Sequence, residues 1–528
     1  MENVFASLLR KNSEELGDKT ALNFENQHSV TYHQLNEITD LLAHGLSQLG
    51  VTKDSKVAML MPNSLEIIYS WLALSKIGAV EVPINTANRG EFLSYIINNS
   101  HSTILIIDEE YLERFLFIMD DLEELKHVII RFKEGARPTL SMRFDVHSFE
   151  DIVSTNDGLS VWNEVRRRDA IAMIYTSGTT GPSKGVLYPV GQAMKAAEEY
   201  LASMGCTRED IFFTCLPLFH GNAQFLCVLA GFISGSTVYI YERFSASKFW
   251  NQIAESRATI FNSLGAMASF IYNQPVCKEE KINTVRACMA APMPVDIFSA
   301  FESRFGLKVI EGYGLTETGM ITYNPWQKTI VGSCGKATEN YEVFVVDEED
   351  NILGPNTIGE IVARSKEPWT MCLGYYKMAE KTVEAFRNFF FHTGDAGLID
   401  KEGYLYFKDR VKDYIRRRGE NISSFEVERV FLAHSNIAEC AAIAVQAEHS
   451  EDEVMVVIVT KDGQLIPYEE LMAYCVQRMP YFAVPRYVLF ENELPKTANE
   501  KIRKDVLRKQ GITTSTWDRE RAGYKISR

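Results

Sequence analysis

A stretch rich in glycine and hydroxyl groups, Tyr175 to Gly185, reads Tyr-Thr-Ser-Gly-Thr-Thr-Gly-Pro-Ser-Lys-Gly. It follows an apolar run, Ala170 to Ile174, which is typical of a buried strand. Glycine and proline disfavour regular structure after that strand, so backbone N–H groups, hydroxyls and the Lys184 ammonium remain available to bind anionic oxygens. These residue types predict a phosphate-binding loop. An ordinary surface turn is the alternative at this point.

The spacing of this loop differs from that of the Walker phosphate loop. The Walker pattern places glycine directly before its lysine and a serine or threonine directly after it, where the hydroxyl binds magnesium. Here Ser183 precedes Lys184 and Gly185 follows it. We therefore expect a phosphate site of another class.

Two further stretches carry groups that suit a nucleotide. Gly312-Tyr-Gly-Leu-Thr-Glu-Thr318 follows a strand pattern directly and offers an aromatic face, a hydroxyl and a carboxylate. It lacks the third glycine of the dinucleotide fingerprint, which disfavours a nicotinamide site. In Thr393-Gly-Asp395, a carboxylate after a glycine turn could accept hydrogen bonds from ribose hydroxyls. Taken alone, a Thr-Gly-Asp sequence is more often a simple turn.

The elements that must position these residues alternate between strands and helices. Before the loop, the pattern predicts strands at Lys56–Met61, Ala79–Ile84, Thr103–Asp108 and His127–Arg131, with helices at Ser64–Lys76, Arg89–Asn98 and Tyr111–Met119. The same alternation recurs from Ile211 to Glu311, with a helix expected at Asn222–Ile233. It predicts an α/β fold of two doubly wound layers, whose ligand crevices lie at the carboxyl ends of the strands.

The pattern changes toward the C-terminus. Between Tyr341 and Arg364 the apolar period becomes two, which predicts a small β-barrel-like subdomain. A charged segment from Lys408 to Gly419 lacks a wide apolar face, and we interpret it as a boundary between domains 1–408 and 409–528. The second is expected to be a small, mobile α+β domain, in which Ser423-x-x-Glu426 can form a capping box at the first helix.

Composition restricts the partners and the compartment. The formal net charge of −15 over 528 residues argues against general affinity for nucleic acid or an anionic membrane. The nine cysteines form no Cys-x-x-Cys pair and lie mostly in apolar segments, so we expect reduced core thiols. The sequence shows neither a secretory signal nor an integral membrane segment. We expect a cytoplasmic protein, and a homodimer as its state of assembly.

Five motifs in this order resemble those of the adenylate-forming superfamily, which contains acyl- and aryl-CoA synthetases, adenylation domains of peptide synthetases and beetle luciferases. They are the loop 175–185, Tyr313–Glu317, Thr393–Asp395, Arg410–Asp413 and Leu494–Arg503. The resemblance extends from Thr31 to Arg508 and implies a two-step reaction with ATP and coenzyme A as co-substrates. A carboxylic acid is first joined to AMP with loss of pyrophosphate, and a thiol then attacks the acyl-adenylate.

The resemblance also implies residue roles around ATP. The residues it assigns to ATP or AMP are Thr176, Ser177, Gly178, Thr179, Thr180, Lys184, Ala291, Pro292, Gly312, Tyr313, Gly314, Thr316, Glu317, Asp395, Arg410 and Lys501. Thr176 and Lys184 would contact the outer phosphates, and Thr176 with Glu317 would bind Mg²⁺. Ala291, Pro292 and Tyr313 would hold adenine.

In the same resemblance, Asp395 and Arg410 would hold the ribose. Lys501 would contact both the carboxylate and the phosphate, with Lys184, Glu317 and His220 as further catalytic residues. Without this motif, we would interpret Lys501 as a solvated lysine in a tail rich in lysine and arginine. Glu500 replaces the glycine that the family carries before this lysine.

The second step requires another surface. By resemblance, the small domain rotates about Lys412 and brings Arg418, Gly419 and Glu420 to coenzyme A. Arg416 and Arg417 could meet its phosphates, with a solvated basic face as the alternative. Ser424 stands where many relatives carry proline. The residues expected in the acyl pocket are His220, Asn222, Gly265, Met267 and Gly312.

Several functions remain open at this stage. The favoured one is an acyl-CoA synthetase. The alternatives are an acyl-AMP ligase that loads a separate carrier protein and an inactive nucleotide-binding relative. Pro83-Ile84-Asn85, Leu216–His220 and Arg418–Ser423 are similar to the crotonobetaine/carnitine-CoA ligase branch, but short- and medium-chain synthetases share much of this pattern. The sequence does not identify the acid.

Overall fold

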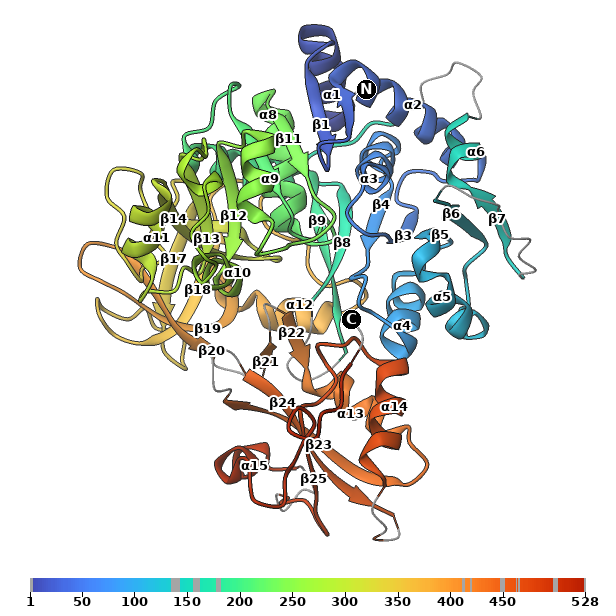
Figure 1. The fold of residues 1–528 in the computed structure, drawn as a ribbon, viewed down its shortest axis with the longest axis vertical. Helices are drawn as coiled ribbons and strands as arrows, with labels where there is room; N and C mark the ends of the chain where they lie inside the picture. The colour runs from blue at the N-terminus through green and yellow to red at the C-terminus, as the bar shows by residue number, and fades with distance from the viewer. Residues whose placement is uncertain are drawn as a thin grey trace.

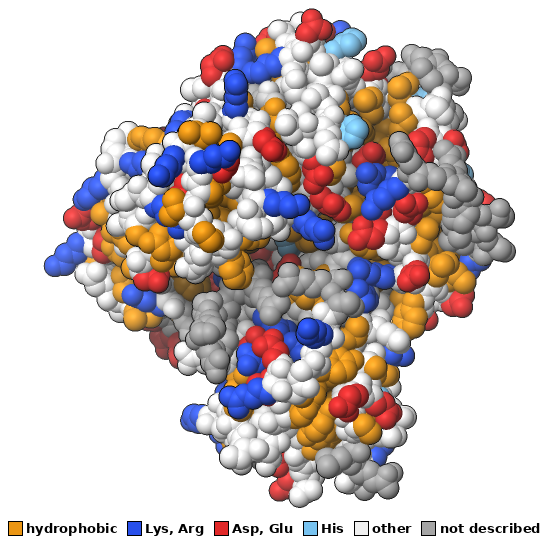
Figure 2. Space-filling model, in the orientation of Figure 1, with side chains coloured by type: hydrophobic (Ala, Val, Ile, Leu, Met, Phe, Trp, Pro, Cys, Tyr) orange, Lys and Arg blue, Asp and Glu red, His pale blue; other side chains and the backbone are white. Residues whose placement is uncertain are grey.

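The structure is a computed structural model with a large N-terminal part and a smaller C-terminal part (Figure 1). It describes residues 3–133, 143–154, 162–176, 182–410, 414–417, 420–446, 452–461, 463, 466–496 and 502–526. Figure 2 shows the same face, on which the C-terminal part forms the narrower lower lobe and acidic and basic side chains are interspersed over both lobes.

The first sheet of the large part has seven strands and is parallel except at one end. In spatial order its strands are β7 (Asp145–Ser148), β6 (His127–Arg131), β5 (Ile104–Asp108), β3 (Lys56–Leu60), β4 (Val80–Pro83), β8 (Ala170–Thr176) and β9 (Lys184–Pro189). Only the β8–β9 pair is antiparallel among them. The accompanying helices are α3 (Leu65–Ile77), α4 (Gly90–Ser100), α5 (Leu112–Ile118) and α6 (Phe149–Ser154), with 3-10 turns η1 (Glu109–Tyr111) and η2 (Met119–Asp121).

The second sheet has nine strands with a parallel centre. Its order is β16 (Lys336–Ala337), β15 (Gly319–Tyr323), β14 (Lys308–Leu315), β13 (Ala287–Ala291), β12 (Ile260–Leu264), β10 (Ile211–Thr214), β11 (Thr237–Ile240), β1 (Thr20–Phe24) and β2 (His28–Thr31). Its helices are α7 (Val190–Met204), the π-helix η3 (Asn222–Leu229), α8 (Ala230–Ser234), α9 (Phe249–Ser256), α10 (Gly265–Tyr272), η4 (Glu279–Lys281) and α11 (Phe298–Phe305). These two sheets confirm the predicted pair of doubly wound layers.

The main core joins elements of both sheets. Phe5 of α1 (Val4–Leu16), Trp71 of α3 and Phe225 of η3 stack edge to face, with ring centroids 6.1 and 5.8 Å apart. The apolar residues of α3 lie all round the helix rather than on one stripe, which is why it is buried on every side. Its Lys76 pairs with Asp40 of α2 (Tyr32–Gln48) at 2.8 Å. The strand and helix pattern assigned from Lys56 onward did not include α1, β1, β2 or α2.

Two expected element boundaries are wrong. The segment Asn222–Ile233 is a π-helix followed by α8 rather than one regular helix. The strand expected to end at Glu311 continues to Leu315 and pairs antiparallel with β15. Gly314 allows this, because a Cβ there would lie 2.1 Å from the carbonyl oxygen of Gly319. The aromatic-glycine motif is therefore part of a strand pair rather than a loop.

The third sheet confirms the predicted change of period. It is antiparallel and contains β17 (Tyr341–Val346), β18 (Gly359–Ser365), β19 (Phe391–Ile399) and β20 (Leu405–Arg410), with α12 (Ala379–Ala385) and η5 (Arg387–Phe389) before β19.

The C-terminal part has its own core and confirms the expected α+β composition. Its strands are β21 (Tyr414–Arg417), β22 (Glu420–Ser423), β23 (Ile437–Gln446), β24 (Asp452–Thr460), β25 (Tyr487–Phe490) and β26 (Trp517–Asp518). Its helices are α13 (Ser424–Leu432), α14 (Tyr468–Arg478) and α15 (Lys504–Gln510). Ser423 caps α13 by accepting from the N–H of Glu426. Over the described ranges, no helix has both the length and the apolar character needed to span a bilayer. All nine cysteines are free thiols, and six of them are buried.

Candidate active site

The expected phosphate loop is held between two paired strands. Antiparallel pairing of β8 with β9 sets Thr176 opposite Lys184, one on each side of the loop. Ser177, Gly178, Thr179 and Thr180 lie outside the described residues. The pairing brings both predicted phosphate ligands to one end of the strand pair.

Tyr375 connects this loop to the second motif. Its ring lies beneath the Lys184 ammonium, 4.3 Å from Nζ to the ring centroid, and its hydroxyl donates to Glu317 Oε1 at 3.0 Å. The backbone of the Glu317 region is also fixed, since Gln192 of α7 donates to the carbonyl oxygen of Thr316 at 2.9 Å. Lys184 and Glu317 therefore converge on one tyrosine. No motif in the sequence indicated Tyr375.

Tyr313 and Asp395 meet where the second and third sheets approach each other. The Tyr313 hydroxyl donates to Asp395 Oδ2 at 2.7 Å, and Asp395 is only 2% exposed. The β19–β20 register sets Asp395 opposite Arg410. Three residues predicted to hold adenosine thus lie together, although their motifs are far apart in the chain.

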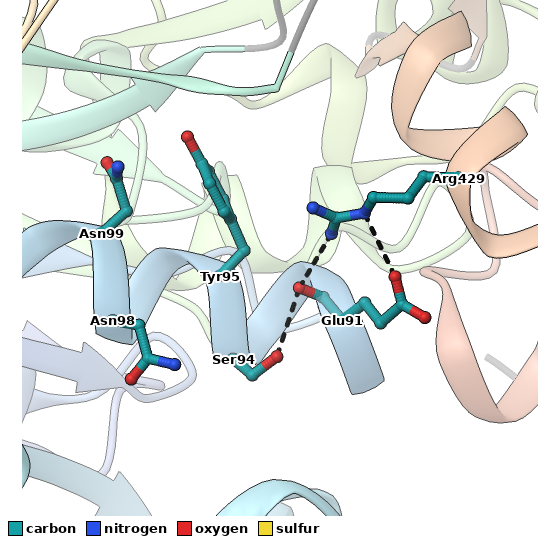
Figure 3. Close-up of a pocket in the computed structure, with 6 residues that line it drawn as sticks. All are labelled: Glu91, Ser94, Tyr95, Asn98, Asn99 and Arg429. Carbon is teal, nitrogen blue, oxygen red and sulfur yellow. Dashed lines mark hydrogen bonds and ion pairs between the residues drawn. The ribbon is translucent and has the colours of Figure 1, made fainter. Parts of the chain in front are cut away.

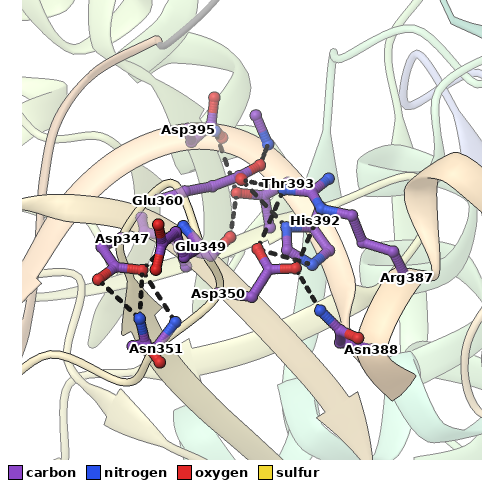
Figure 4. A network of polar contacts seen from close by, with 12 residues as sticks. Asp347, Glu349, Asp350, Asn351, Glu360, Arg387, Asn388, His392, Thr393 and Asp395 are labelled. Atoms are coloured by element: carbon purple, nitrogen blue, oxygen red, sulfur yellow. Dashed lines mark hydrogen bonds and ion pairs between the residues drawn. The ribbon is translucent and has the colours of Figure 1, made fainter.

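A polar network supports the Thr393-Gly-Asp395 segment (Figure 4). This segment lies within β19 rather than in the glycine turn that its sequence suggested. Glu360 of β18 accepts from the backbone N–H of Gly394 and from His392 Nδ1, both at 3.0 Å. Burial would raise the pKa of Glu360, but these hydrogen bonds outweigh it and hold the pKa below its ordinary value. The same carboxylate pairs with Arg387 at 3.0 Å. This network fixes the backbone that carries Asp395.

The segment expected to line adenine is attached to β14. Glu311 Oε1 accepts from the N–H of Met293 at 2.9 Å, next to Pro292. Burial raises the pKa of Glu311 to about 7. Ala291 pairs with Leu264 in the β12–β13 register, so the expected adenine segment and the expected acyl pocket lie at neighbouring strand ends.

The predicted acyl-pocket residues are grouped at the end of β12. Asn222 opens the π-helix η3, and its Oδ1 accepts from Asn262 Nδ2 at 2.8 Å. Gly265 begins α10 directly after β12, and Met267 is buried in that helix. Gly312 lies on β14, two strands away. π-helical turns occur often at functional sites, which agrees with this placement.

Glu420 brings the C-terminal part to the edge of this pocket. Its Oε1 lies 3.7 Å from His220 Nε2 and accepts from Asn85 Nδ2 at 3.1 Å. Lys412, Arg418, Gly419 and Lys501 lie outside the described residues. Glu420, expected near coenzyme A, thus contacts His220 of the expected acyl pocket.

Arg417 has a structural role, which corrects the expectation that it could meet coenzyme A phosphates. It is 2% exposed, and its guanidinium pairs with Glu453 at 2.6 Å. It also donates to the carbonyl oxygens of Phe482 and Val484 at 3.0 and 3.1 Å. The side chain holds the core of the C-terminal part together.

The two parts also meet at the expected phosphate loop. Ser183 donates to Glu426 Oε1 of α13 from its backbone N–H at 3.0 Å and from its hydroxyl, while its carbonyl oxygen accepts from Tyr95 at 3.0 Å. Burial raises the pKa of Glu426. The Glu426 carboxylate, expected to complete a capping box, is instead directed at the loop of the large part.

A cavity of about 430 Å³ lies beside this contact, between α4 and α13 (Figure 3). Arg429 reaches across it to Glu91, with Nε and Oε2 3.1 Å apart. Asn99, also in its wall, accepts from the Tyr175 hydroxyl at 2.7 Å. The motifs gave no signal for this interface, because its residues come from helices outside them.

Comparisons with known proteins agree with this arrangement. The AMP-binding enzyme family model matches residues 9–376, and the model of the AMP-binding enzyme C-terminal domain matches residues 426–501. The chain is 31% identical over 507 residues to a crotonobetaine/carnitine–CoA ligase of Citrobacter koseri, covering 94% of this chain and 97% of that protein. It is 30% identical to the ligase of that name from Salmonella typhi, covering 93% and 96%.

Solved structures share the fold over almost the whole chain. One is o-succinylbenzoate CoA synthetase from Bacillus subtilis with a product analogue, at TM-score 0.81 and 24% identity, covering 95% of this chain and 98% of that one. Another is ATP-bound MatB from Rhodopseudomonas palustris, at TM-score 0.70 and 25% identity, covering 96% and 98%. With its motifs in order and both family models matched, the chain belongs to the AMP-binding, adenylate-forming enzyme family.

Proposed function

We propose that this protein is an ATP-dependent acid–thiol ligase that makes an acyl-CoA. The observation that carries the proposal is the convergence of Lys184 with Glu317 and of Tyr313 with Asp395, beside a pocket edge where Glu420 approaches His220. The first pair suits a polyphosphate and the second an adenosine. The pocket edge suits an acyl group that must meet a thiol.

In the first step, a carboxylate oxygen bonds to the α-phosphorus of ATP while the bond to the bridging oxygen breaks and pyrophosphate leaves. Lys184 and Thr176 would hold the outer phosphates, and Asp395 and Arg410 the ribose. Lys501 would neutralise charge that develops at the α-phosphate. Orienting two anions against each other is a large part of this catalysis.

Magnesium fits the residues at this site as an ion carried by ATP. Mg²⁺ prefers oxygen ligands, keeps several waters and is usually bound by one or two carboxylates together with substrate phosphates. Glu317 offers one carboxylate and Thr176 one hydroxyl. Across the described residues, no group of three or more His, Cys, Asp or Glu side chains could hold a metal. Bound Mg²⁺ would screen the phosphate charges.

In the second step, the thiol sulfur of coenzyme A attacks the acyl carbon, the bond to the AMP oxygen breaks, and the thiol proton is lost. We propose that domain 409–528 turns about Lys412 between the steps and that Arg418, Gly419 and Glu420 guide the thiol. The contact of Glu420 with His220 suits the second step.

A carboxylate panel assayed for AMP release with and without coenzyme A tests the proposal. Crotonobetaine and carnitine come first, because ligases similar to this chain in sequence carry those names. AMP formation that requires coenzyme A is the expected result. AMP release that does not change when coenzyme A is added would favour an acyl-AMP ligase that loads a carrier protein. Absence of pyrophosphate exchange into ATP with every acid would favour an inactive nucleotide-binding relative. Cytoplasmic location and a homodimer stay predictions.

Lys501→Ala should separate the two steps. We expect adenylation, measured by pyrophosphate exchange, to fall by about 100-fold or more, because charge stabilisation at the phosphate is lost. Thioester formation from supplied acyl-adenylate should stay near the wild-type rate. Lys509→Ala, an exposed lysine on α15, is the matched control and should affect neither step. Equal loss of both steps in Lys501→Ala would contradict the domain rotation.

A further inference from the structure

A chain of three side chains runs from the interior of the large part to the expected acyl pocket. The Tyr200 hydroxyl of α7 donates to Asn262 Oδ1 at 2.6 Å, and Asn262 Nδ2 donates to Asn222 Oδ1 at 2.8 Å. Tyr200 is 1% exposed and Asn262 is 3% exposed, while Asn222 is half-buried. The chain therefore begins in the core and ends at an accessible amide.

The buried end determines the orientation of both amides. A fully buried hydroxyl needs an acceptor for its proton, and Asn262 Oδ1 is the acceptor that Tyr200 has. Asn262 must then present its NH₂ group to the next residue, and only an oxygen of Asn222 can accept from it. Burial also raises the pKa of Tyr200 well above its ordinary value, so the phenol keeps its proton. Turning the Asn222 amide over would place two donors against each other.

The amide nitrogen of Asn222 is consequently the end that faces outward. Within the described residues it has no partner, and it is not among the buried unpartnered atoms, so it is open to a ligand. Asn222 lies two residues after His220, which contacts Glu420, and beside β12, which leads into Gly265 and Met267. An N–H donor of fixed direction therefore stands in the expected acyl pocket.

We propose that Asn222 Nδ2 selects acids whose acyl chain carries a hydrogen-bond acceptor, such as a hydroxyl, keto or second carboxylate oxygen. Tyr200 and Asn262 act as positioning residues that keep the donor directed at this oxygen. The proposal rests on the proposed ligase function and adds a substrate class to it. An acid that lacks this oxygen excludes water from the Asn222 amide when it binds and offers no acceptor in its place. The donor is then left without a partner, which lowers the affinity for that acid.

Matched acids and one isosteric change test the proposal. The pairs are carnitine with γ-butyrobetaine, β-hydroxybutyrate with butyrate, and levulinate with pentanoate, where the first member carries the extra oxygen. For the wild type we expect kcat/KM in pyrophosphate exchange to favour the oxygen-bearing member of at least one pair by about 10- to 100-fold. Asn222→Asp keeps an oxygen for Asn262 to donate to but replaces the outward donor by an oxygen.

The ratio of kcat/KM values within a pair is the decisive quantity, since damage to the fold lowers kcat/KM for both acids alike. Asn222→Leu, which removes the donor without adding charge, should abolish the preference in every pair. Asn222→Asp should abolish it for levulinate over pentanoate, because a keto oxygen cannot donate to the new carboxylate. Tyr200→Phe, which keeps the ring, should reduce the preference by a smaller factor while the thermal unfolding midpoint reports its stability. If the wild type is active but treats each pair alike, or if Asn222→Leu preserves the preference, this inference is overturned and the ligase function stands. If no acid supports exchange, both fail.

Discussion

Glu81 and Gln224 form a fully buried pair. Every donor in this pair can have an acceptor, and every acceptor a donor, only if the carboxyl group of Glu81 is protonated. Gln224 Nε2 donates to Glu81 Oε1, and both side chains are at most 3% exposed. The remaining atoms, Glu81 Oε2 and Gln224 Oε1, are both oxygens and have no hydrogen-bond partner among the described residues. A proton on Oε2 would let it donate to Gln224 and satisfy both atoms at once. Burial raises the pKa of Glu81 to about 8, which agrees with a neutral acid.

This pair predicts a pH-dependent stability. The folded protein keeps a proton that the unfolded chain loses above the ordinary glutamate pKa of 4.5. The stability that Glu81 contributes is therefore complete below pH 4.5 and declines until the pH passes about 8. The steepest decline is about 1.4 kcal/mol per pH unit. Glu81→Gln keeps a head-to-head amide pair without a titrating proton.

The measurement is the free energy of unfolding by denaturant from pH 5 to pH 9 for both proteins. We expect the difference between Glu81→Gln and wild type to grow in favour of the variant as the pH rises. A difference that stays constant with pH would show that Glu81 does not take up a proton on folding.

At the scale of elements, the β14–β15 pair places the Tyr313 and Glu317 motifs. A Cβ on Gly314 would lie 2.1 Å from the Gly319 carbonyl oxygen and 2.9 Å from the Met320 Cα, so a larger residue must push two backbones apart. Gly314→Ala should therefore lower the free energy of unfolding by about 1–3 kcal/mol. ATP affinity should fall as well, because Tyr313 and its bond to Asp395 move with the strand.

Gly354→Ala is the matched control for this prediction. Gly354 lies in an exposed turn, and nothing stands within 4 Å of a Cβ built there. We expect its unfolding free energy to stay within about 0.5 kcal/mol of wild type. If Gly314→Ala and the control gave equal unfolding curves and equal ATP titrations, the β14–β15 pair would tolerate separation of its strands, and this prediction would be wrong.

At the scale of the whole molecule, Glu426 joins the C-terminal part to the expected phosphate loop. Its carboxylate accepts hydrogen bonds from the N–H and the hydroxyl of Ser183, which precedes Lys184. Such donors are suited to a phosphate, so Glu426 and pyrophosphate would compete for them. This arrangement therefore fits a loop from which pyrophosphate has left.

Glu426→Ala should impair the second step more than the first. Hydrogen bonds to a charged group contribute about 1.5–3 kcal/mol, so we expect thioester formation from supplied acyl-adenylate to fall by about tenfold. Pyrophosphate exchange should change by less than about threefold, because the proposed first step uses another orientation of the C-terminal part. Glu469→Gln, on the exposed face of α14, serves as the control. A larger loss in exchange than in thioester formation would contradict the role assigned to this contact.

The sequence by itself determined the class of the fold and the family of the chemistry. The strand at His127–Arg131 and the helix at Tyr468–Arg478 have the predicted bounds, because apolar periodicity is a local property that burial preserves. The order of the motifs indicated which residues are expected to bind ATP. Boundaries failed where long-range contacts override local pattern, as at Gly314, whose strand continues because β15 pairs with it.

Only the tertiary structure decided how the motifs meet. Tyr375 joins Lys184 to Glu317, Glu426 reaches Ser183 from the other part of the molecule, and Tyr200 sets the direction of the Asn222 amide. No spacing in the sequence indicates these contacts, since each joins residues that only folding brings within hydrogen-bonding or ring-stacking distance. The physical reason is that hydrogen bonding and burial depend on distance in space, whereas a motif records distance along the chain.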